Sequence, residues 1–194
     1  MLRAMVLMFG LMVASTQEAH ACRCVVPDVI SSYQTRDHAF VARAVSVQMG
    51  AQYHVWTFRL VKDLKGCERP GATIRVVTAS DPSACGASFT PGVSYLVYAT
   101  DVNIGGRRVW QTTTCDGNRE LSQLTRDEIG YLMDRPITCN GVTTCANGSQ
   151  PVSCLVDPCT TSPACRGATC EANYCGGCTA EWYDVNGAGQ CMPW

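Results

Sequence analysis

The sequence predicts a mainly β protein, in which a small closed barrel of five strands with peripheral helices is followed by a small disulfide-rich module. Three observations predict this organisation. Five short segments with a β pattern lie between glycine and proline turn signals in the first two thirds of the 194-residue chain. All 14 cysteines lie at or beyond position 22. They are densest in the last part of the chain, and cysteine at this density indicates a disulfide framework in an oxidising compartment.

The first 21 residues have the pattern of a secretory signal peptide, with an apolar run from Ala4 to Ala14 and small residues before a predicted cleavage site. That run is too short for a membrane-spanning helix, which needs about 20 residues. Lipoprotein processing at Cys22 is an alternative, but Ala19 and His20 do not supply the Leu-like residue that it expects. We therefore expect export, with residues 1–21 removed and Cys22 first in the mature chain.

Residues 22–137 contain the predicted barrel. We expect its strands at Ala39–Val47, Tyr53–Val61, Thr73–Ala79, Tyr95–Ala99 and Arg108–Thr114. Trp56, Phe58 and Leu60 alternate onto one face of the second strand, and Ile74 and Val76 share a face of the third. Five short strands have exposed edges unless they close, and for that reason we expect a barrel.

Two stretches have helical patterns. The first is Pro27–His38, and the second is Thr125–Met133, where Thr125 is the expected N-cap. Asp127 and Glu128 fall in the first turn of the second stretch, where negative charge is favourable. We expect both helices at the periphery of the barrel.

Residues 138–194 form the predicted C-terminal module, which has almost no apolar periodicity. Such a segment cannot bury enough apolar surface to fold alone, so cross-links must take the place of a core. The CxxC of Cys175 and Cys178 is compatible with structural disulfides, a zinc ribbon or a thioredoxin-like redox pair. We expect structural disulfides, because a redox pair should open a helix and Thr179–Tyr183 has the pattern of a strand. The pairing among the eight cysteines from Cys145 to Cys191 stays open.

Composition and motifs argue against an enzyme. The chain has 15 Lys and Arg against 16 Asp and Glu, a balance that attracts neither nucleic acid nor an anionic membrane. Beyond the leader only His38 and His54 remain, in different predicted elements, and the common catalytic motifs are missing. We predict no enzymatic activity and no cofactor. Arg107-Arg108 near Trp110 is the one hint of a nucleic-acid groove, and export argues against it.

The spacing of the first two cysteines of the mature chain indicates long-range bridges. Cys22 and Cys24 are two residues apart, so their side chains point to the same side of an extended chain. A bridge between them would be strained. Their partners must lie far along the chain, and Cys85 and Cys115, both at predicted strand ends, are candidates. In the chain-entropy model, closing such loops stabilises a fold by about 4 kcal/mol each.

Several short motifs occur together in residues 22–139. They are Cys22-Arg23-Cys24, Lys65-Gly66, Ser83-Ala84-Cys85-Gly86 followed by Phe89, Tyr95–Ala99, and Thr-Thr-Cys ending at Cys115. In order and spacing they resemble the netrin-like domain of the tissue inhibitors of metalloproteinases, which is a barrel of the oligonucleotide/oligosaccharide-binding (OB) type. Other extracellular proteins carry this domain without blocking proteases. The run from Cys165 to Cys191 resembles small cysteine-rich modules of extracellular proteins.

The resemblance implies Cys22–Cys85 and Cys24–Cys115 bridges and a protease-binding wedge. The wedge residues would be Cys22, Arg23, Cys24, Val25, Val26, Ser83, Ala84 and Cys85. In the inhibitors, the free amine and the carbonyl oxygen of the first cysteine chelate the catalytic zinc of the protease, a role that falls to Cys22 here. Catalytic zinc keeps a coordination position open for such ligands, and a bridged terminus loses little freedom on binding.

The chain departs from the family pattern at two places. The residue after the first cysteine enters the specificity pocket of the protease and is usually small or apolar, whereas Arg23 is long and charged. Burying an unpaired charge is costly, so a protease with an acidic pocket suits Arg23 better than an ordinary matrix metalloprotease. The family's third bridge lacks its first cysteine here. Cys67 with Cys139 is the expected substitute, which leaves an even number of cysteines behind it.

We therefore expect a secreted protein, extracellular or periplasmic in a Gram-negative host, that inhibits a zinc endopeptidase. Its partner would be a secreted or cell-surface zinc metalloprotease or another extracellular protein, and neither nucleic acid nor a membrane. The alternative is an extracellular netrin-like binding or adhesion module in which the N-terminal bridges are only structural. A redox enzyme that uses Cys175 and Cys178 is a third class.

Overall fold

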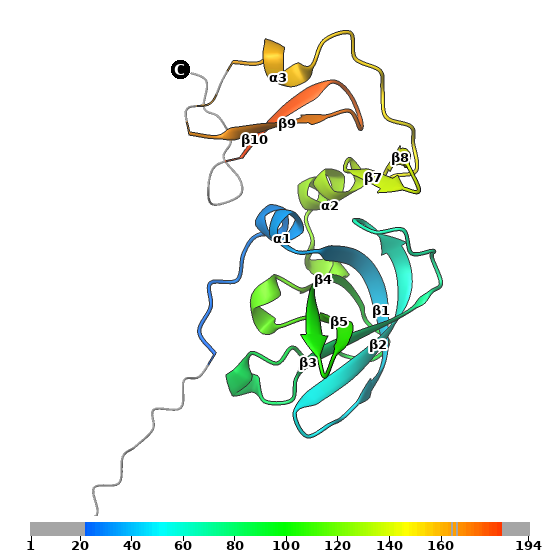
Figure 1. The fold of residues 1–194 in the computed structure, drawn as a ribbon, viewed down its shortest axis with the longest axis vertical. Coiled ribbons are helices and arrows are strands. Elements are labelled where there is room, and N and C mark those ends of the chain that lie inside the picture. Colours follow the sequence, from blue (N-terminus) through cyan, green and yellow to red (C-terminus); the bar gives the residue numbers. More distant parts are fainter. Residues whose placement is uncertain (1–21, 164, 166, 184–194) are drawn as a thin grey trace, which may run out of the picture.

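The computed structural model describes residues 22–163, 165 and 167–183 (Figure 1). The predicted leader at 1–21 and the last cysteine, Cys191, lie outside the described residues. The protein is mainly β, as predicted, and its main sheet has six strands. No helix in the described part is long and apolar enough to cross a membrane.

Five strands of the main sheet pair in a ring. They are β1 (His38–Gln48), β2 (Tyr53–Asp63), β3 (Thr73–Ala79), β4 (Ser94–Ile104) and β5 (Arg107–Gln111). The pairing runs β1-β2-β3-β5-β4, and β4 also pairs with β1. The β3–β5 pair is parallel and the other pairs in the ring are antiparallel. A short strand, β6 (Arg119–Glu120), adds to β4.

The core inside this ring includes the side chains that the strand alternation predicted. Trp56, Phe58 and Leu60 are 4%, 0% and 2% exposed, and Ile74 and Val76 are buried with them. The Phe58 ring meets the ring of Phe89 edge to face, with the centroids 5.0 Å apart, which is a favourable aromatic geometry. The prediction of which face of β2 and of β3 is buried is therefore confirmed.

A second core lies under two helices, α1 (Val29–Thr35) and α2 (Arg126–Met133), and the hairpin of β7 (Pro136–Cys139) with β8 (Val142–Cys145). It contains the buried side chains of Val29, Tyr33, Leu64, Leu96, Tyr98, Leu132, Ile137 and Ala146. The hydroxyl of Tyr98 donates to the carbonyl oxygen of Val29 at 2.9 Å and so joins β4 to α1. The residue at which we expected the modules to divide, 137, lies within β7 and packs in this core.

The helix predicted at Pro27–His38 was too long. Asp28 caps α1 by accepting a hydrogen bond from the backbone N–H of Ser31 at 2.8 Å, so Pro27 stays outside the helix. Arg36 is extended, and His38 already belongs to β1. For α2 the prediction is confirmed, because Thr125 is the N-cap and forms a capping box with Glu128.

Two strand ends also differ from the prediction. The β4 strand continues past Ala99 to Ile104, because its polar second half pairs with β5. The β5 strand ends at Gln111, three residues earlier than predicted, because Thr113 caps a short 3-10 helix at Thr114–Asp116.

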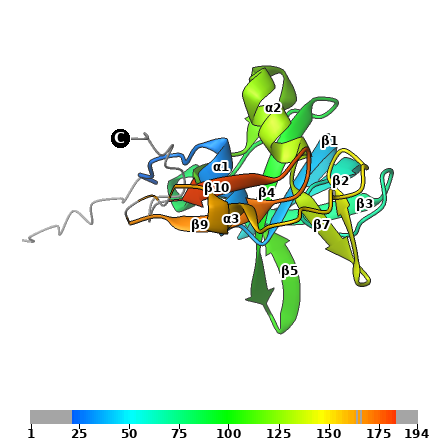
Figure 2. The same cartoon turned by 90° about the horizontal axis from the view of Figure 1, so that it is seen from above.

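The C-terminal segment contains α3 (Pro158–Thr161) and a hairpin of β9 (Thr169–Asn173) with β10 (Thr179–Tyr183) (Figures 1 and 2). Its bridges are Cys145–Cys175, Cys154–Cys178 and Cys159–Cys170. Cys165 is disulfide-bonded as well. Arg135, buried next to α2, forms an ion pair with Glu181 of β10 and thus joins this hairpin to the rest of the protein.

Candidate functional site

The N-terminal segment ahead of α1 is cross-linked to the ends of two strands. Cys22 is bonded to Cys85, in the loop after β3, and Cys24 is bonded to Cys115, in the turn after β5. Because β3 and β5 are parallel, their carboxyl ends lie at the same edge of the sheet. The backbone N–H of Thr114 donates to the carbonyl oxygen of Cys85 at 3.0 Å. These contacts place both bridges side by side, at the positions that the family resemblance implies.

The loop that carries Cys85 has a tightly determined shape. The Asp81 carboxylate accepts a hydrogen bond from the backbone N–H of Ser83 at 2.8 Å, and this hydrogen bond holds the pKa of Asp81 below its usual value. A short 3-10 helix at Pro82–Ala84 follows, and Cys85 has a left-handed backbone with φ 61°. A Cβ atom on Gly86 would lie 2.2 Å from the carbonyl oxygen of Ala79, so only glycine fits there.

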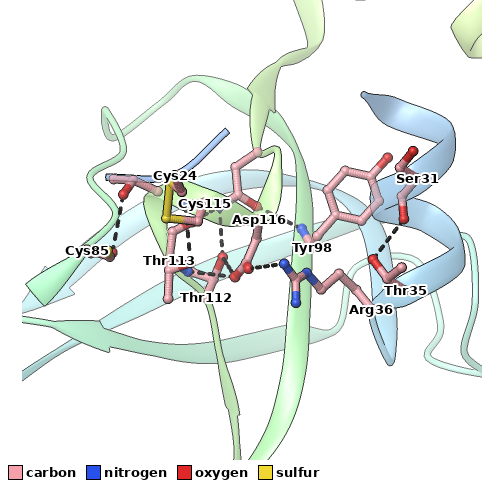
Figure 3. A network of polar contacts seen from close by, with 12 residues as sticks. Cys24, Ser31, Thr35, Arg36, Cys85, Tyr98, Thr112, Thr113, Cys115 and Asp116 are labelled. Carbon is pink, nitrogen blue, oxygen red and sulfur yellow. Dashed lines mark hydrogen bonds and ion pairs between the residues drawn. A yellow bond between two sulfur atoms is a disulfide. The ribbon is translucent and has the colours of Figure 1, made fainter. Parts of the chain in front are cut away.

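The turn that carries Cys115 is held by a buried carboxylate, that of Asp116 (Figure 3). Asp116 accepts a hydrogen bond from the backbone N–H of Thr113 at 2.7 Å, and the Thr113 side chain accepts one from the backbone of Asp116, so the two residues form a capping box. The Thr113 hydroxyl oxygen also accepts a hydrogen bond from the N–H of Cys115 at 3.2 Å. An Nη atom of Arg36, just after α1, lies 3.0 Å from the other carboxylate oxygen. The ion pair therefore ties the Cys115 turn to the end of α1.

Two further contacts fix this turn. Asn118 donates to the Thr112 hydroxyl at 2.7 Å and accepts a hydrogen bond from the backbone N–H of Tyr98 at 2.8 Å. Gly117 has φ 84°, and a Cβ atom there would lie 2.3 Å from the hydroxyl oxygen of Ser32 on α1. The turn is therefore closely packed on α1 and hydrogen-bonded to β4.

Beyond the two bridges the segment is open to solvent. Arg23 and Cys24 are exposed, as are Val25 and Val26, whose side chains are 94% and 51% exposed. The residues from Cys22 to Val26 line a depression of about 650 Å³, together with Pro82 and Thr114. Ser83 and Ala84, which the resemblance also assigns to the wedge, are exposed in the neighbouring loop but are not part of this lining.

The cluster of sulfur atoms at the site cannot ligate a metal as thiolates. The Sγ atoms of Cys22, Cys24 and Cys115 lie within 4.8 Å of one another. All three belong to disulfides, and a disulfide sulfur lacks the negative charge with which cysteine binds metals. These sulfur atoms therefore do not make the site a metal site.

The third predicted bridge, Cys67–Cys139, is present and joins the loop after β2 to β7. Lys65, just before it, donates from Nζ to the carbonyl oxygens of Tyr33 and Arg36 at 2.6 and 2.5 Å. It thus satisfies carbonyl groups at the end of α1. Burial lowers the pKa of this lysine. Lys65 therefore has a structural role at the end of α1.

The cysteines of the CxxC motif are not bonded to each other. Cys175 is bonded to Cys145 of β8, and Cys178 to Cys154 in the loop before α3. Each joins the loop between β9 and β10 to a different part of the segment. This arrangement fits the structural interpretation of the motif and leaves neither thiolates for a zinc ribbon nor a dithiol pair.

Sequence reasoning missed Asp116, Arg36 and Asn118, which hold the Cys115 turn. One local signal was available, because Thr113 with Asp116 is a capping box of the type Ser/Thr-x-x-Asp/Glu. The contacts to Arg36 and Asn118 have no such signal, since they depend on how α1 and β4 pack. Comparison of the chain with protein-family models and with curated proteins finds no match.

Proposed function

We propose that this protein is an exported inhibitor of a zinc metalloprotease, with a netrin-like domain of the type found in the tissue inhibitors of metalloproteinases. Two features support the domain assignment. The strand pairing, with a parallel β3–β5 contact and β4 returning to β1, fits a five-stranded, partly open barrel of the OB type. Cys22 and Cys24 are bonded to the two cysteines that the resemblance implies.

The observation that carries the proposal is that a disulfide holds Cys22 in place directly before solvent-exposed residues. Removal of residues 1–21 would leave the amine of Cys22 free, in a residue bonded to Cys85 and adjacent to the Cys24–Cys115 bridge. The amine and the Cys22 carbonyl oxygen can form a five-membered chelate on the zinc of a protease, at the coordination position that water normally occupies. An α-amino group has a pKa near neutrality, so its deprotonation requires little free energy.

The two bridges would raise the affinity of this chelate for zinc by lowering the entropic cost of binding. A flexible terminus would lose conformational entropy on binding, whereas a cross-linked one is already ordered. The loop of Cys85 and the turn of Cys115 are themselves fixed by Gly86, Asp116 and Gly117. The exposed residues that follow Cys22 would then extend along the substrate cleft.

Arg23 would select the target. Its exposed side chain comes directly after the chelating residue and would point into the main specificity pocket. A guanidinium group buried without a partner in an apolar pocket is unfavourable, while a pocket with a carboxylate would form a charge-assisted pair with it. We therefore expect inhibition of a zinc endopeptidase with an acidic pocket.

The test compares two forms of the exported protein against a panel of secreted zinc proteases. One form begins at Cys22, as established by N-terminal sequencing, and the other carries one additional N-terminal alanine. The extra residue removes the chelating amine and leaves both bridges intact, so we expect it to abolish inhibition. Equal inhibition by both forms contradicts the chelate mechanism.

An Arg23→Val variant tests the pocket. We expect it to lose affinity for proteases with acidic pockets and to gain affinity for those with apolar ones. If neither the mature protein nor Arg23→Val inhibits any protease of the panel, the alternative of a non-inhibitory extracellular binding module is favoured. A mature chain that retains residues before Cys22, or carries a lipid on it, also contradicts the proposal.

A further inference from the structure

The two N-terminal bridges bring their sulfur atoms into contact with each other. Cys22 is bonded to Cys85, and Cys115 is bonded to Cys24 (Figure 3). The Sγ atom of Cys22 lies 3.5 Å from the Sγ atom of Cys115, although these two residues belong to different bridges. The Sγ atom of Cys24 lies within 4.8 Å of both. One sulfur atom of each bridge is therefore within reach of the other bridge.

The lengths of the two loops do not favour this pairing over the alternative one. The observed bridges join residues that are 63 and 91 positions apart. An exchange of partners would join Cys22 to Cys115, which are 93 positions apart, and Cys24 to Cys85, so the two loop lengths would hardly change. The entropic contribution of a disulfide depends on the logarithm of the loop length. The two pairings therefore constrain the unfolded chain almost equally.

The loop of Cys85 and the turn of Cys115 are held together by contacts that use no sulfur atom. The backbone N–H of Thr114 donates to the carbonyl oxygen of Cys85 at 3.0 Å. Gly86 and Thr113, on either side of this contact, form a β-bridge. These hydrogen bonds remain when a disulfide opens. The two cysteines of the strand ends would then still lie next to each other and could each accept either cysteine of the terminus.

Cys24 is the member of the cluster that is most open to attack from solvent. It is exposed, whereas Cys22, Cys85 and Cys115 are half-buried. It also lines the depression of about 650 Å³ at the N-terminal segment. Thiol–disulfide exchange begins when a thiolate attacks a disulfide sulfur that it can reach. The accessible point of attack is therefore the Sγ atom of Cys24, with Cys115 as the leaving group.

We propose that a small monothiol makes these two bridges exchange partners, which gives the site a second pairing, Cys22–Cys115 with Cys24–Cys85. In the first step the thiolate of the small molecule attacks the Sγ atom of Cys24. The Cys24–Cys115 bond breaks, a mixed disulfide forms on Cys24, and Cys115 leaves as a thiolate. This step places a nucleophile 3.5 Å from the Sγ atom of Cys22.

The remaining steps stay within the cluster. The Cys115 thiolate attacks Cys22, the Cys22–Cys85 bond breaks, and Cys85 leaves as a thiolate when the Cys22–Cys115 bond forms. The Cys85 thiolate then attacks the mixed disulfide at Cys24, closes the Cys24–Cys85 bond and releases the small thiolate. Each step replaces one S–S bond by another. The thiol is therefore a catalyst, and neither an oxidant nor a reductant is consumed.

The exchange would switch the activity of the terminus, a consequence that rests on the protease inhibition proposed above. Cys22 would be transferred from the loop of Cys85 to the turn of Cys115. Its amine and carbonyl oxygen would then have a new position relative to Ser83 and Ala84, the other part of the wedge. A protease that fits the observed pairing would not fit the second one. Inhibition would therefore depend on the thiol content of the surroundings.

Tryptic mapping of the mature, oxidised protein distinguishes the two pairings. Trypsin cleaves after Arg23 and so separates Cys22 from Cys24. It also cleaves at the arginines of β5, which lie between Cys85 and Cys115. In the observed pairing the dipeptide Cys22-Arg23 is linked to the peptide that contains Cys85. In the second pairing the same dipeptide is linked to the peptide that contains Cys115.

The protein is incubated with reduced glutathione, alkylated, digested without reduction and analysed by mass spectrometry. We expect the Cys22–Cys115 product only when the thiol is present. Because the thiolate is the attacking species, the product should form about tenfold faster at pH 7 than at pH 6.

A Cys24→Ser variant tests the central step without an added thiol. It leaves Cys115 as a free thiol 3.5 Å from the Sγ atom of Cys22, so we expect both pairings of Cys22 in the purified variant. The matched control is Cys67→Ser, which frees Cys139. The Sγ atom of Cys139 contacts a carbonyl oxygen, and we expect it to remain a free thiol.

Two results of the mapping would overturn the proposal. One is the absence of the Cys22–Cys115 product at a thiol concentration that already opens the Cys67–Cys139 bridge, whose Cys67 is also exposed. The other is its appearance together with pairs such as Cys22–Cys139, which would show that the chain unfolds.

Neither of these results involves a protease, so the exchange and the proposed function can fail separately. If the observed pairing inhibits no protease, the proposed function fails and the peptide map still stands. If the observed pairing does inhibit, inhibition should fall in proportion to the fraction of Cys22–Cys115. Constant inhibition in the face of complete exchange would contradict the switch.

Discussion

Replacement of Asp116 by alanine should destabilise the protein far more than loss of an ordinary surface carboxylate. Asp116 is 5% exposed. Its carboxylate accepts hydrogen bonds from the Thr113 backbone N–H and the Thr112 hydroxyl and forms an ion pair with Arg36. A hydrogen bond to a charged group contributes about 1.5–3 kcal/mol. The Thr112 contact, at 3.4 Å, is long, and Arg36 is 29% exposed and can regain water. We therefore count the two close contacts at the lower value, which gives about 3 kcal/mol.

The measurement is thermal unfolding of the mature, oxidised protein. For a chain of this size, a loss of about 3 kcal/mol lowers Tm by about 6–12 °C. Asp116→Asn keeps an acceptor for the Thr113 N–H and loses only the charge, so it should cost about half as much. Asp127→Ala is the matched control, because that carboxylate is exposed in the first turn of α2 and contributes about 0.5 kcal/mol.

A double-mutant cycle with Arg36→Ala isolates the ion pair. The two side chains contact each other directly, so we expect a coupling energy of about 1 kcal/mol. If Asp116→Ala costs no more than Asp127→Ala, or if the coupling is zero, the account of how the Cys115 turn is held is wrong.

Two other changes test local features of the helices. Burial alone would raise the pKa of Asp28, but hydrogen bonds from the backbone and hydroxyl of Ser31 outweigh it and hold that pKa below its usual value. The folded state therefore keeps Asp28 ionised to lower pH than the unfolded state does. The resulting stabilisation is fully present above the unfolded pKa of about 4. It is lost as the pH falls through the pKa of the folded state. Asp28→Ala should lower the free energy of unfolding by about 1 kcal/mol near neutral pH. The difference in Tm between this variant and the wild type should become smaller in acid. A difference in Tm that grows in acid would contradict this explanation. Gly130→Ala should stabilise α2 by up to about 1 kcal/mol, because an added Cβ meets no atom within 4 Å; a lower melting temperature would show an unrecognised contact.

The local features of the fold were largely predictable. The alternation of Trp56, Phe58 and Leu60 identifies a half-buried strand because the side-chain period of a strand is two. Thr125 marks the start of α2 because its hydroxyl satisfies a free backbone N–H. Both signals lie within a few residues of the features that they predict. The extension of β4 to Ile104 was missed because its polar residues gain their place in the strand by pairing with β5.

The disulfides were likewise predictable only in part. The family resemblance supplied the Cys22–Cys85 and Cys24–Cys115 pairs, and counting of cysteines supplied Cys67–Cys139. The C-terminal bridges could not be assigned, because the spacing of cysteines along a chain does not determine which sulfur atoms meet. Their pairing depends on the position of β8, α3 and the β9–β10 hairpin, which only the folded chain has.

The amino-acid sequence alone was enough to identify a mainly β protein that is rich in disulfides. These properties follow from local periodicity and composition, which every short segment carries whatever its surroundings. That Arg36 pairs with Asp116, and that Thr114 lies next to Cys85, is visible only in the folded chain. Such contacts join residues that are distant in sequence, and they exist because the parallel β3–β5 pairing and the packing of α1 bring those residues together.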